Sequence, residues 1–200
     1  MYFAKDFQND FDVSRETLDK FQAYHDLILK WQKRINLISP QTVPDTWHRH
    51  FADSAQLSNY LNKNDILVDI GAGGGFPGLV LSIMGHKTHL VDSDTRKCVF
   101  LKTVARELDL NCEIHNARAE DLNGLNADIV VSRATASISN LCDWGLPLTR
   151  KKSFWLLKGE TAPQECDEAA ELFDFDVEML ASATHPGGFI VHLHNVSRET

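Results

Sequence analysis

The sequence predicts an α/β fold in which a mostly parallel sheet follows an N-terminal helical extension. From residue 65 onward, short apolar runs typical of strands alternate with segments of helical periodicity. Strands separated by helices form βαβ units, whose strands are parallel and whose crossovers are right-handed. In the first 64 residues, apolar residues recur instead three and four positions apart, as they do in helices. We therefore expect a helical extension over residues 1–64 and an α/β core over residues 65–200.

Two amphipathic helices are expected in the extension. Ser14 is a suitable N-cap for the first, in which apolar residues recur three and four positions apart. Pro40 ends that segment, because the residue before a proline avoids the helical region. The second helix is expected over residues 44–61. On it Arg49 and Asp53 are four positions apart, so they are expected to face each other.

The core elements follow from the change of period after residue 65. In chain order we expect a strand at 66–70, a helical segment at 77–84, strands at 88–93, 111–116, 128–132 and 153–158, and helices at 95–108 and 139–146. The tail differs, because residues 173–181 and 187–196 both have strand composition and a turn around His185–Gly188 joins them. The sheet is therefore expected to finish with an antiparallel pair.

Composition and charge exclude several classes of protein. The net charge of −8 disfavours strong binding of free RNA or DNA by this chain alone, because neutralisation of phosphates by cationic side chains supplies most of the non-specific affinity. A small-molecule substrate, or a nucleic acid presented by a larger assembly, fits better.

The sequence predicts no membrane span and no signal peptide, so a cytoplasmic location is expected. The four cysteines are widely spaced without a CxxC pair, which favours buried thiols over disulfides or a zinc site.

The segment from Asp69 to Gly78, DIGAGGGFPG, is expected to bind a ligand. An apolar strand stops there at four glycines in five positions, and glycine tolerates positive φ and a close approach to the backbone. In doubly wound sheets, ligands bind beyond the carboxyl ends of the strands. Asp92 ends the second strand, 23 residues after Asp69. A carboxylate in that position is placed to accept hydrogen bonds from both hydroxyls of a ribose.

The charge beside the glycine loop distinguishes two nucleoside cofactors. Gly73, Gly75 and Gly78 satisfy GxGxxG, which alone would suggest NAD. Asp69, however, puts a carboxylate before the loop, where it would repel a pyrophosphate but attract a cation. S-adenosylmethionine (SAM) carries a sulfonium and an ammonium and no phosphate. We therefore expect SAM; the structural alternative is a tight turn whose glycines bind nothing.

Several segments together resemble one known family. They are Asp69–Gly78, Val91–Ser93, Arg118–Leu122, Ser132–Ala134 and Leu157–Gly159, with Asn36–Leu37 and Arg49–Ser54 in the extension. In order and over nearly the whole chain, they are similar to the RsmG family, also called glucose-inhibited division protein B. The resemblance implies a class I SAM-dependent methyltransferase that methylates N7 of a guanine in the 530 loop of 16S rRNA. Ile38 replaces the threonine of the family's NLT segment.

The resemblance also implies cofactor contacts by Gly71, Phe76, Ala119, Glu120 and Arg133, in addition to those expected of Asp69, Gly73 and Asp92. In this interpretation the backbone N–H of Ala119 and the carboxylate of Glu120 bind adenine, and Phe76 covers the methionine end. A cation beside a sulfonium is unfavourable, so Arg133 is expected to bind an anion, either the methionine carboxylate or an RNA phosphate. A salt bridge between two loops is the alternative.

The expected substrate contacts are Asn36, Arg49, His50 and Lys158. Lys158 ends a strand at the edge that faces the substrate, and with Arg133 it is a candidate for positioning the base. His50 is equally expected to pack against the sheet. No catalytic residue is expected, because guanine N7 has an exposed lone pair and no proton to remove.

Absent motifs agree with methylation at N7. The chain has SRAT after the fourth strand, where methylation of an exocyclic amine commonly uses an N/D-P-P-Y/F segment. No cysteine stands at a strand end, as methylation of a pyrimidine at C5 would need. His192 and His194 share one face of a strand, but two ligands do not make a metal site, so no metal is expected.

The resemblance implies 16S rRNA as the substrate, and the net charge of −8 predicts that this RNA is presented within a small-subunit ribosomal particle and not as naked RNA. Two alternatives remain open. One is a SAM-dependent methyltransferase that acts on another substrate, a protein or a small molecule. The other is a non-catalytic module of the same fold that binds the ribosome.

Overall fold

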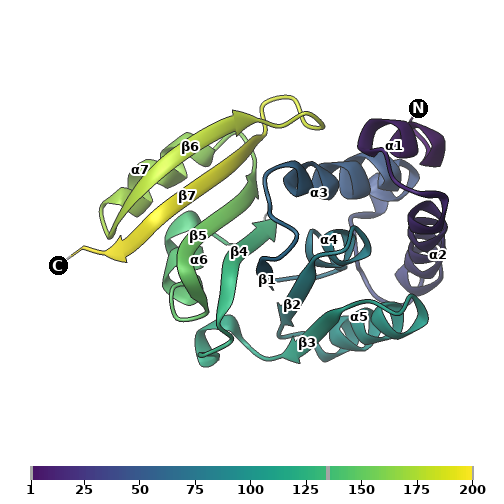
Figure 1. Ribbon diagram of the computed structural model, residues 1–200, viewed down its shortest axis with the longest axis horizontal. Helices are drawn as coiled ribbons and strands as arrows, with labels where there is room; N and C mark the ends of the chain where they lie inside the picture. The colour runs from purple at the N-terminus through teal and green to yellow at the C-terminus, as the bar shows by residue number, and fades with distance from the viewer. Residues whose placement is uncertain (1, 134–135, 200) are drawn as a thin grey trace.

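A computed structural model of the chain describes residues 2–133 and 136–199 and has the predicted mostly parallel sheet (Figure 1). The strands follow the order β3-β2-β1-β4-β5-β7-β6. They are β1 (Ile66–Ile70), β2 (Lys87–Asp92), β3 (Cys112–Asn116), β4 (Ala127–Arg133), β5 (Thr149–Lys158), β6 (Phe173–Ala181) and β7 (Phe189–Arg198). The first five pair in parallel, whereas β7 runs antiparallel to both β5 and β6. The predicted antiparallel end of the sheet is confirmed.

Helices cover both faces of this sheet. They are α4 (Gly78–Ile83), α5 (Thr95–Glu107), α6 (Ile138–Gly145) and α7 (Ala162–Ala170). Apolar residues of α4 and α5 pack with Leu90, while those of α6 and α7 pack with Val68 and Val91. Neighbouring residues of one strand point to opposite faces, so Leu90 and Val91 enter different cores. α7 was not predicted, because only the small residues Ala162, Cys166 and Ala169 are buried on it.

The extension contains α1 (Ala4–Phe11), α2 (Arg15–Gln32) and a mixed helical segment made of η1 (Pro40–Asp45), η2 (Trp47–Ala52), α3 (Asp53–Ala55) and η3 (Gln56–Asn59). Ser14 caps α2 as predicted, and its side chain accepts from the Thr17 N–H at 3.1 Å. The helix ends at Gln32, before the predicted stop at Pro40. The Gln32 side chain accepts from Leu37 N–H and donates to the Ile38 carbonyl, which holds the chain in a turn.

The second predicted helix begins earlier than expected and is irregular. It starts at Pro40 with a 3₁₀ segment, and residues 47–52 form a π-helical turn. The predicted pairing of Arg49 with Asp53 is replaced by other contacts. The Asp53 carboxylate lies 3.4 Å from Arg133 on β4 and accepts from the Thr184 hydroxyl at 2.6 Å. A π-helical turn shifts residues away from the spacing that an α-helix gives, so the four-residue rule does not apply here.

The extension and the α/β part share one apolar core. Phe7, Phe21 and Phe51 of the extension pack in a cluster that also contains Phe76 of the glycine loop and Phe100 of α5. Residues on both sides of the predicted boundary at residue 64 therefore pack together.

Three of the four cysteines are buried and the fourth, Cys112, is half-buried, and all are free thiols, as predicted. Among the described residues, no helix combines the length and apolar content needed to cross a membrane. Ala134, part of the SRA segment, lies outside the described residues.

Candidate cofactor and substrate site

The glycine loop joins β1 to α4 and has a backbone that few other residues could adopt. Gly71, Gly73 and Gly75 have φ angles of 73°, 56° and 96°, in the left-handed region that favours glycine. A Cβ on Gly75 would also lie 2.5 Å from the Tyr24 hydroxyl. That hydroxyl donates to the carbonyl of Gly74 at 2.5 Å, so helix α2 of the extension holds the loop from behind.

Asp92, the residue expected to accept from a ribose, ends β2 and is held there by two backbone N–H groups. Its carboxylate accepts from the N–H groups of Gly73 and Asp94, both at 2.8 Å. An ionised carboxylate has about four acceptor positions, so these two bonds leave room for two hydroxyl donors. The carboxylate thus connects the glycine loop to the end of β2 and still presents free lone pairs.

A cleft of about 340 Å³ lies beside Asp92 at the carboxyl ends of the first three strands, and we term it the β1–β2 cleft. Gly71, Ala119 and Glu120, three of the residues expected to contact the cofactor, line it. Ala119 is buried in the short 3₁₀ helix η4 (Ala119–Asp121), and Glu120 lies 3.6 Å from Arg118. Trp144 of α6 also lines the cleft, which sequence reasoning missed because that residue lies far along the chain. Its ring gives the cleft an aromatic wall suited to a flat base.

Asp69 lies beneath the loop and is absent from the lining of the β1–β2 cleft. It is fully buried, and its Oδ2 accepts from the Gly78 N–H at 2.7 Å. Burial raises the pKa of Asp69 to about 7, against the opposing effect of the Gly78 hydrogen bond. A Cβ on Gly78 would lie 2.6 Å from the same oxygen. Asp69 therefore holds the start of α4 against β1, and its predicted direct contact with the cofactor remains a prediction.

A second cleft, of about 290 Å³, opens at the ends of β4 and β5, and we term it the β4–β5 cleft. The structure brings four predicted residues together in its lining, namely Arg49, His50, Arg133 and Lys158. The remaining predicted substrate residue, Asn36, lies elsewhere. It is exposed in a depression shared with Arg34, Arg96 and Lys97.

Arg133 is held by groups of the protein itself. Its guanidinium lies 3.4 Å from Asp53, donates to the Arg49 carbonyl at 3.0 Å and lies 2.8 Å from His50 Nδ1. It also stands over the Phe76 ring, 4.7 Å from the centroid. Burial lowers the pKa of Arg133, and the Asp53 charge opposes this shift. The salt-bridge alternative describes this geometry, although the bridge joins β4 to the extension and does not join two loops.

Phe76 is enclosed within the core and does not lie open over a cleft. Its ring is 3 % exposed and packs against Tyr24, His50 and Arg133. Its predicted contact with the methionine end of the cofactor stays a prediction. The ring does support the loop and the guanidinium of Arg133 from one side.

His50 is a neutral, buried hydrogen-bonding residue. Its Nδ1 accepts from Arg133, so the proton lies on Nε2, which donates to the Thr42 hydroxyl at 2.8 Å. Burial, aided by the charges of Arg133 and Arg49, lowers the pKa of His50 to about 3. The imidazole therefore positions Arg133 without carrying a charge.

Lys158 is also engaged inside the protein. Its ammonium lies 2.6 Å from Glu165 of α7 and donates to the Ala136 carbonyl at 2.6 Å, and the residue is 8 % exposed. The sequence predicted a lysine that faces the substrate at a strand end. Lys158 does line the β4–β5 cleft, but an ion pair with an unpredicted helix partly neutralises it.

The His50→Gln variant is expected to flatten the dependence of stability on pH. The pKa of His50 is 6.5 in the unfolded chain and about 3 in the folded chain. Between these two pH values the unfolded chain binds a proton on His50 and the folded chain does not. This costs about 1.4 kcal/mol of stability per pH unit. Glutamine offers the same acceptor and donor without titrating. From about pH 6 to pH 4, urea unfolding should therefore show wild type losing about 2–3 kcal/mol more than the variant. Parallel pH profiles would contradict the assigned protonation state.

Known proteins resemble this chain over most of its length. The family profile of rRNA small subunit methyltransferase G, or GidB, matches residues 17–188. Ribosomal RNA small subunit methyltransferase G of Paramagnetospirillum magneticum is 45% identical over 93% of this chain and 92% of the relative. The protein of the same name from Rhodospirillum centenum is 43% identical over 97% of this chain and 91% of the relative.

Solved structures show the same fold at low sequence identity. TYW2 of M. jannaschii in complex with AdoMet has a TM-score of 0.59 at 16% identity, covering 84% of this chain and 80% of that one. A SAM-dependent methyltransferase from Aquifex aeolicus has a TM-score of 0.61 at 13% identity, covering 78% and 98%. The predicted fold class, that of the SAM-dependent methyltransferases, is confirmed. With a family profile that matches most of its length, the chain belongs to the rRNA small subunit methyltransferase G family.

Proposed function

We propose that this chain transfers the methyl group of SAM to N7 of a guanine in the 530 loop of 16S rRNA. The observation that carries the proposal is the pair of clefts at the carboxyl edge of one sheet. The β1–β2 cleft has the glycine loop and Asp92, and the β4–β5 cleft has Arg133 at the end of the strand next to β1. Two neighbouring clefts suit a reaction in which a cofactor and a base must meet.

The residues that line the β1–β2 cleft support SAM as its ligand. Gly71 leaves the backbone open to close approach, and Asp92 has free lone pairs for the ribose hydroxyls. Glu120 and the backbone of Ala119 stand where they could bind the polar edge of adenine, and Trp144 offers an apolar wall. SAM supplies a methyl group on a positively charged sulfur, which a nucleophile displaces. The chain's own task is to hold the two reactants in line.

The β4–β5 cleft suits a base that needs no deprotonation. His50 is neutral with its acceptor nitrogen already bonded to Arg133, so it is poorly placed to remove a proton. Guanine N7 carries a lone pair and no proton, and its methylation depends on alignment with the methyl group. The rigid contacts among Arg133, Asp53 and His50 would fix one wall of the cleft.

A basic groove between α2 and α5 is the surface that we propose for the RNA backbone. Its volume is about 700 Å³, and its lining includes Trp31, Glu107 and five cationic side chains: Lys30, Lys33, Arg34, Arg96 and Arg106. Arg34 and Arg96 continue into the depression that holds Asn36, and Lys97 lines both that depression and the β1–β2 cleft. This local concentration of cations, in a chain of net charge −8, leads toward the cofactor site.

A small-subunit ribosomal particle is the proposed working substrate. A chain with this net charge gains little from non-specific attraction to free RNA, so it needs a substrate held in one conformation by other components. A ribosomal substrate would also place the protein in the cytoplasm.

The proposal is tested by mapping methylated nucleosides by mass spectrometry in rRNA from cells with and without the gene. N7-methylguanine in the 530 loop should vanish without it, and its persistence would refute the proposed function. Purified protein should methylate small-subunit particles from the deleted strain faster than protein-free 16S rRNA. Equal rates on the two would contradict the particle as substrate. A methylated protein or small molecule in place of rRNA, or no methylation at all, would favour the two alternative interpretations.

Reversing two charges in the basic groove is expected to weaken the binding of the RNA substrate and leave the binding of SAM unchanged. Lys30→Glu with Arg34→Glu changes two exposed residues, and kcat/KM for the particle should fall by about tenfold or more at physiological salt. SAM affinity, measured by calorimetry, should not change. The matched control is Lys5→Glu with Arg15→Glu, which makes the same charge change at exposed positions outside the groove. An equal loss in both double variants would mean that net charge, and not the groove, matters.

A further inference from the structure

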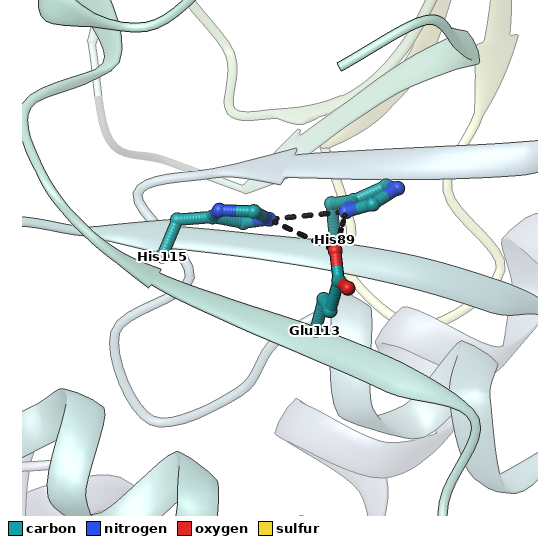
Figure 2. Close-up of side chains that lie close together, drawn as sticks. All are labelled: His89, Glu113 and His115. Carbon is teal, nitrogen blue, oxygen red and sulfur yellow. Dashed lines mark hydrogen bonds and ion pairs between the residues drawn. The ribbon is translucent and has the colours of Figure 1, made fainter.

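Three potential metal ligands meet on one face of the sheet, at the edge formed by β2 and β3. The parallel register places His89 opposite Glu113, and the alternation along β3 puts His115 on the same face as Glu113. Figure 2 shows the two imidazole rings and the carboxylate converging on one point. The sequence offered no sign of this cluster, because it depends on the register between two strands.

The distances among the three donor atoms match the spacing around a single metal ion. His89 Nδ1 lies 3.0 Å from His115 Nε2 and 3.2 Å from Glu113 Oε2, and the last two atoms are 3.8 Å apart. Ligand atoms at about 2.0–2.1 Å from Zn²⁺ in tetrahedral geometry are about 3.3 Å from one another. One ion could therefore contact all three without moving any strand.

The chemistry of the donors is also suitable. Two imidazoles and one carboxylate form a common zinc ligand set, which leaves a fourth position for water. Metal ions bind neutral imidazole, and burial lowers the pKa of both His89 and His115, which favours that form. Without an ion, two ring nitrogens share one hydrogen bond at 3.0 Å and the carboxylate competes for it.

The site is anchored at one side and open at the other. The side chain of His89 is 9% exposed, that of His115 is 22% exposed and that of Glu113 is 70% exposed. The connection from β3 to β4 contains the three-residue helix η4, whereas the two preceding connections carry α4 and α5. An ion could reach the cluster past Glu113 without displacing the core.

We propose that His89, Glu113 and His115 form a binding site for a divalent transition-metal ion, with Zn²⁺ as the best fit. The ion ties β2 to β3 three residues before Asp92 and four before Ala119, so it stiffens the strand ends that frame the β1–β2 cleft. This inference stands on the geometry of the cluster and is independent of the proposed substrate. A second grouping, Glu178, His192 and His194 on β6 and β7, also brings two imidazoles and a carboxylate together, with His192 Nδ1 3.6 Å from Glu178 Oε2, so a variant in it shows which of the two groupings binds the ion.

Untagged protein, freed of metal with a chelator and dialysed, is titrated with ZnCl₂ by calorimetry and with CoCl₂ by visible absorption. We expect one equivalent of Zn²⁺ at micromolar affinity or tighter, a tetrahedral Co²⁺ spectrum and a higher thermal midpoint with Zn²⁺. His115→Gln should lower the affinity by more than about 100-fold, since even outer-shell partners of a metal ligand contribute 10–100-fold. His192→Gln should leave it unchanged.

The exposed residue Glu113 supplies a second variant that does not disturb the core. Glu113→Gln keeps the shape but weakens the ligand, so it should lower Zn²⁺ affinity with an unaltered circular dichroism spectrum. No binding of Zn²⁺ at micromolar concentration would overturn the proposal. Binding that survives His115→Gln and Glu113→Gln but is lost in His192→Gln would overturn it as well.

Discussion

Arg133→Met is expected to lower the free energy of unfolding by about 3–5 kcal/mol, the usual cost of removing one partner from a buried ion pair. The Arg133 and Asp53 side chains are 18% and 13% exposed, so water cannot replace the guanidinium fully. The substitution also leaves His50 Nδ1 and the Arg49 carbonyl without their donor. Urea unfolding measures the change, and a constant slope with denaturant would show that the variant still folds to the same compact state.

A double-mutant cycle separates the ion pair from simple loss of volume. Asp53→Asn alone should also destabilise the chain, because it leaves the Arg133 charge with a weaker partner. Arg133→Met combined with Asp53→Asn should cost less than the sum of the two single changes, since neither charge is then left alone. Additive losses, or a loss below about 1 kcal/mol for Arg133→Met, would show that the pair does not hold the extension to β4.

Local signals explain the parts of the fold that the sequence predicts well. Helix α5 begins at Thr95, as expected, because the Asp94 side chain caps it by accepting from the Arg96 and Lys97 N–H groups. The glycine loop and Asp92 were predicted to act together because they follow neighbouring strands of one βαβ unit. Each of these features depends on a short stretch of chain and on one general rule of topology.

The features that the sequence misses depend on contacts between distant residues. For Arg133 the sequence left an external anion and a salt bridge open, and it did not identify Asp53 as a partner, because Asp53 lies 80 residues earlier and contacts Arg133 through the packing of the extension on the sheet. Lys158 was expected at the substrate edge and does line the β4–β5 cleft, but its ion pair with Glu165 was missed, because Glu165 belongs to a helix whose small apolar residues gave little signal. The position of a charged side chain at a strand end can be predicted from the sequence. Its ion-pair partner cannot, because that partner belongs to another element that packs over the strand end.

The same limit applies to Asp69 and to the metal ligands. Asp69 was correctly placed before the glycine loop, but its complete burial depends on α4 and could not be seen in a strand pattern. His192 and His194 were noticed because they are neighbours on one strand. His89 and His115 were not, because β2 and β3 must first align in register.

Asp92→Ala is expected to weaken SAM binding by about 100-fold or more, the second large effect. A hydrogen bond to a charged group contributes about 1.5–3 kcal/mol, and alanine removes the acceptor for both proposed ribose hydroxyls. It also releases the Gly73 N–H, which the carboxylate holds at 2.8 Å. Calorimetry with SAM or S-adenosylhomocysteine measures the loss, and unchanged affinity would remove the ribose role from Asp92.

Because alanine affects both the ribose contact and the loop, a ligand analogue is needed to separate them. Asp92→Asn keeps one acceptor for Gly73 and loses the charge, so it should bind more tightly than the alanine variant but more weakly than wild type. In wild type, removing a ribose hydroxyl from S-adenosylhomocysteine should cost about tenfold in affinity or more. If Asp92 accepts from that hydroxyl, the same change in ligand should cost much less in Asp92→Asn. An equal cost in both proteins would mean that Asp92 acts by holding Gly73 alone, and that the ribose has another partner.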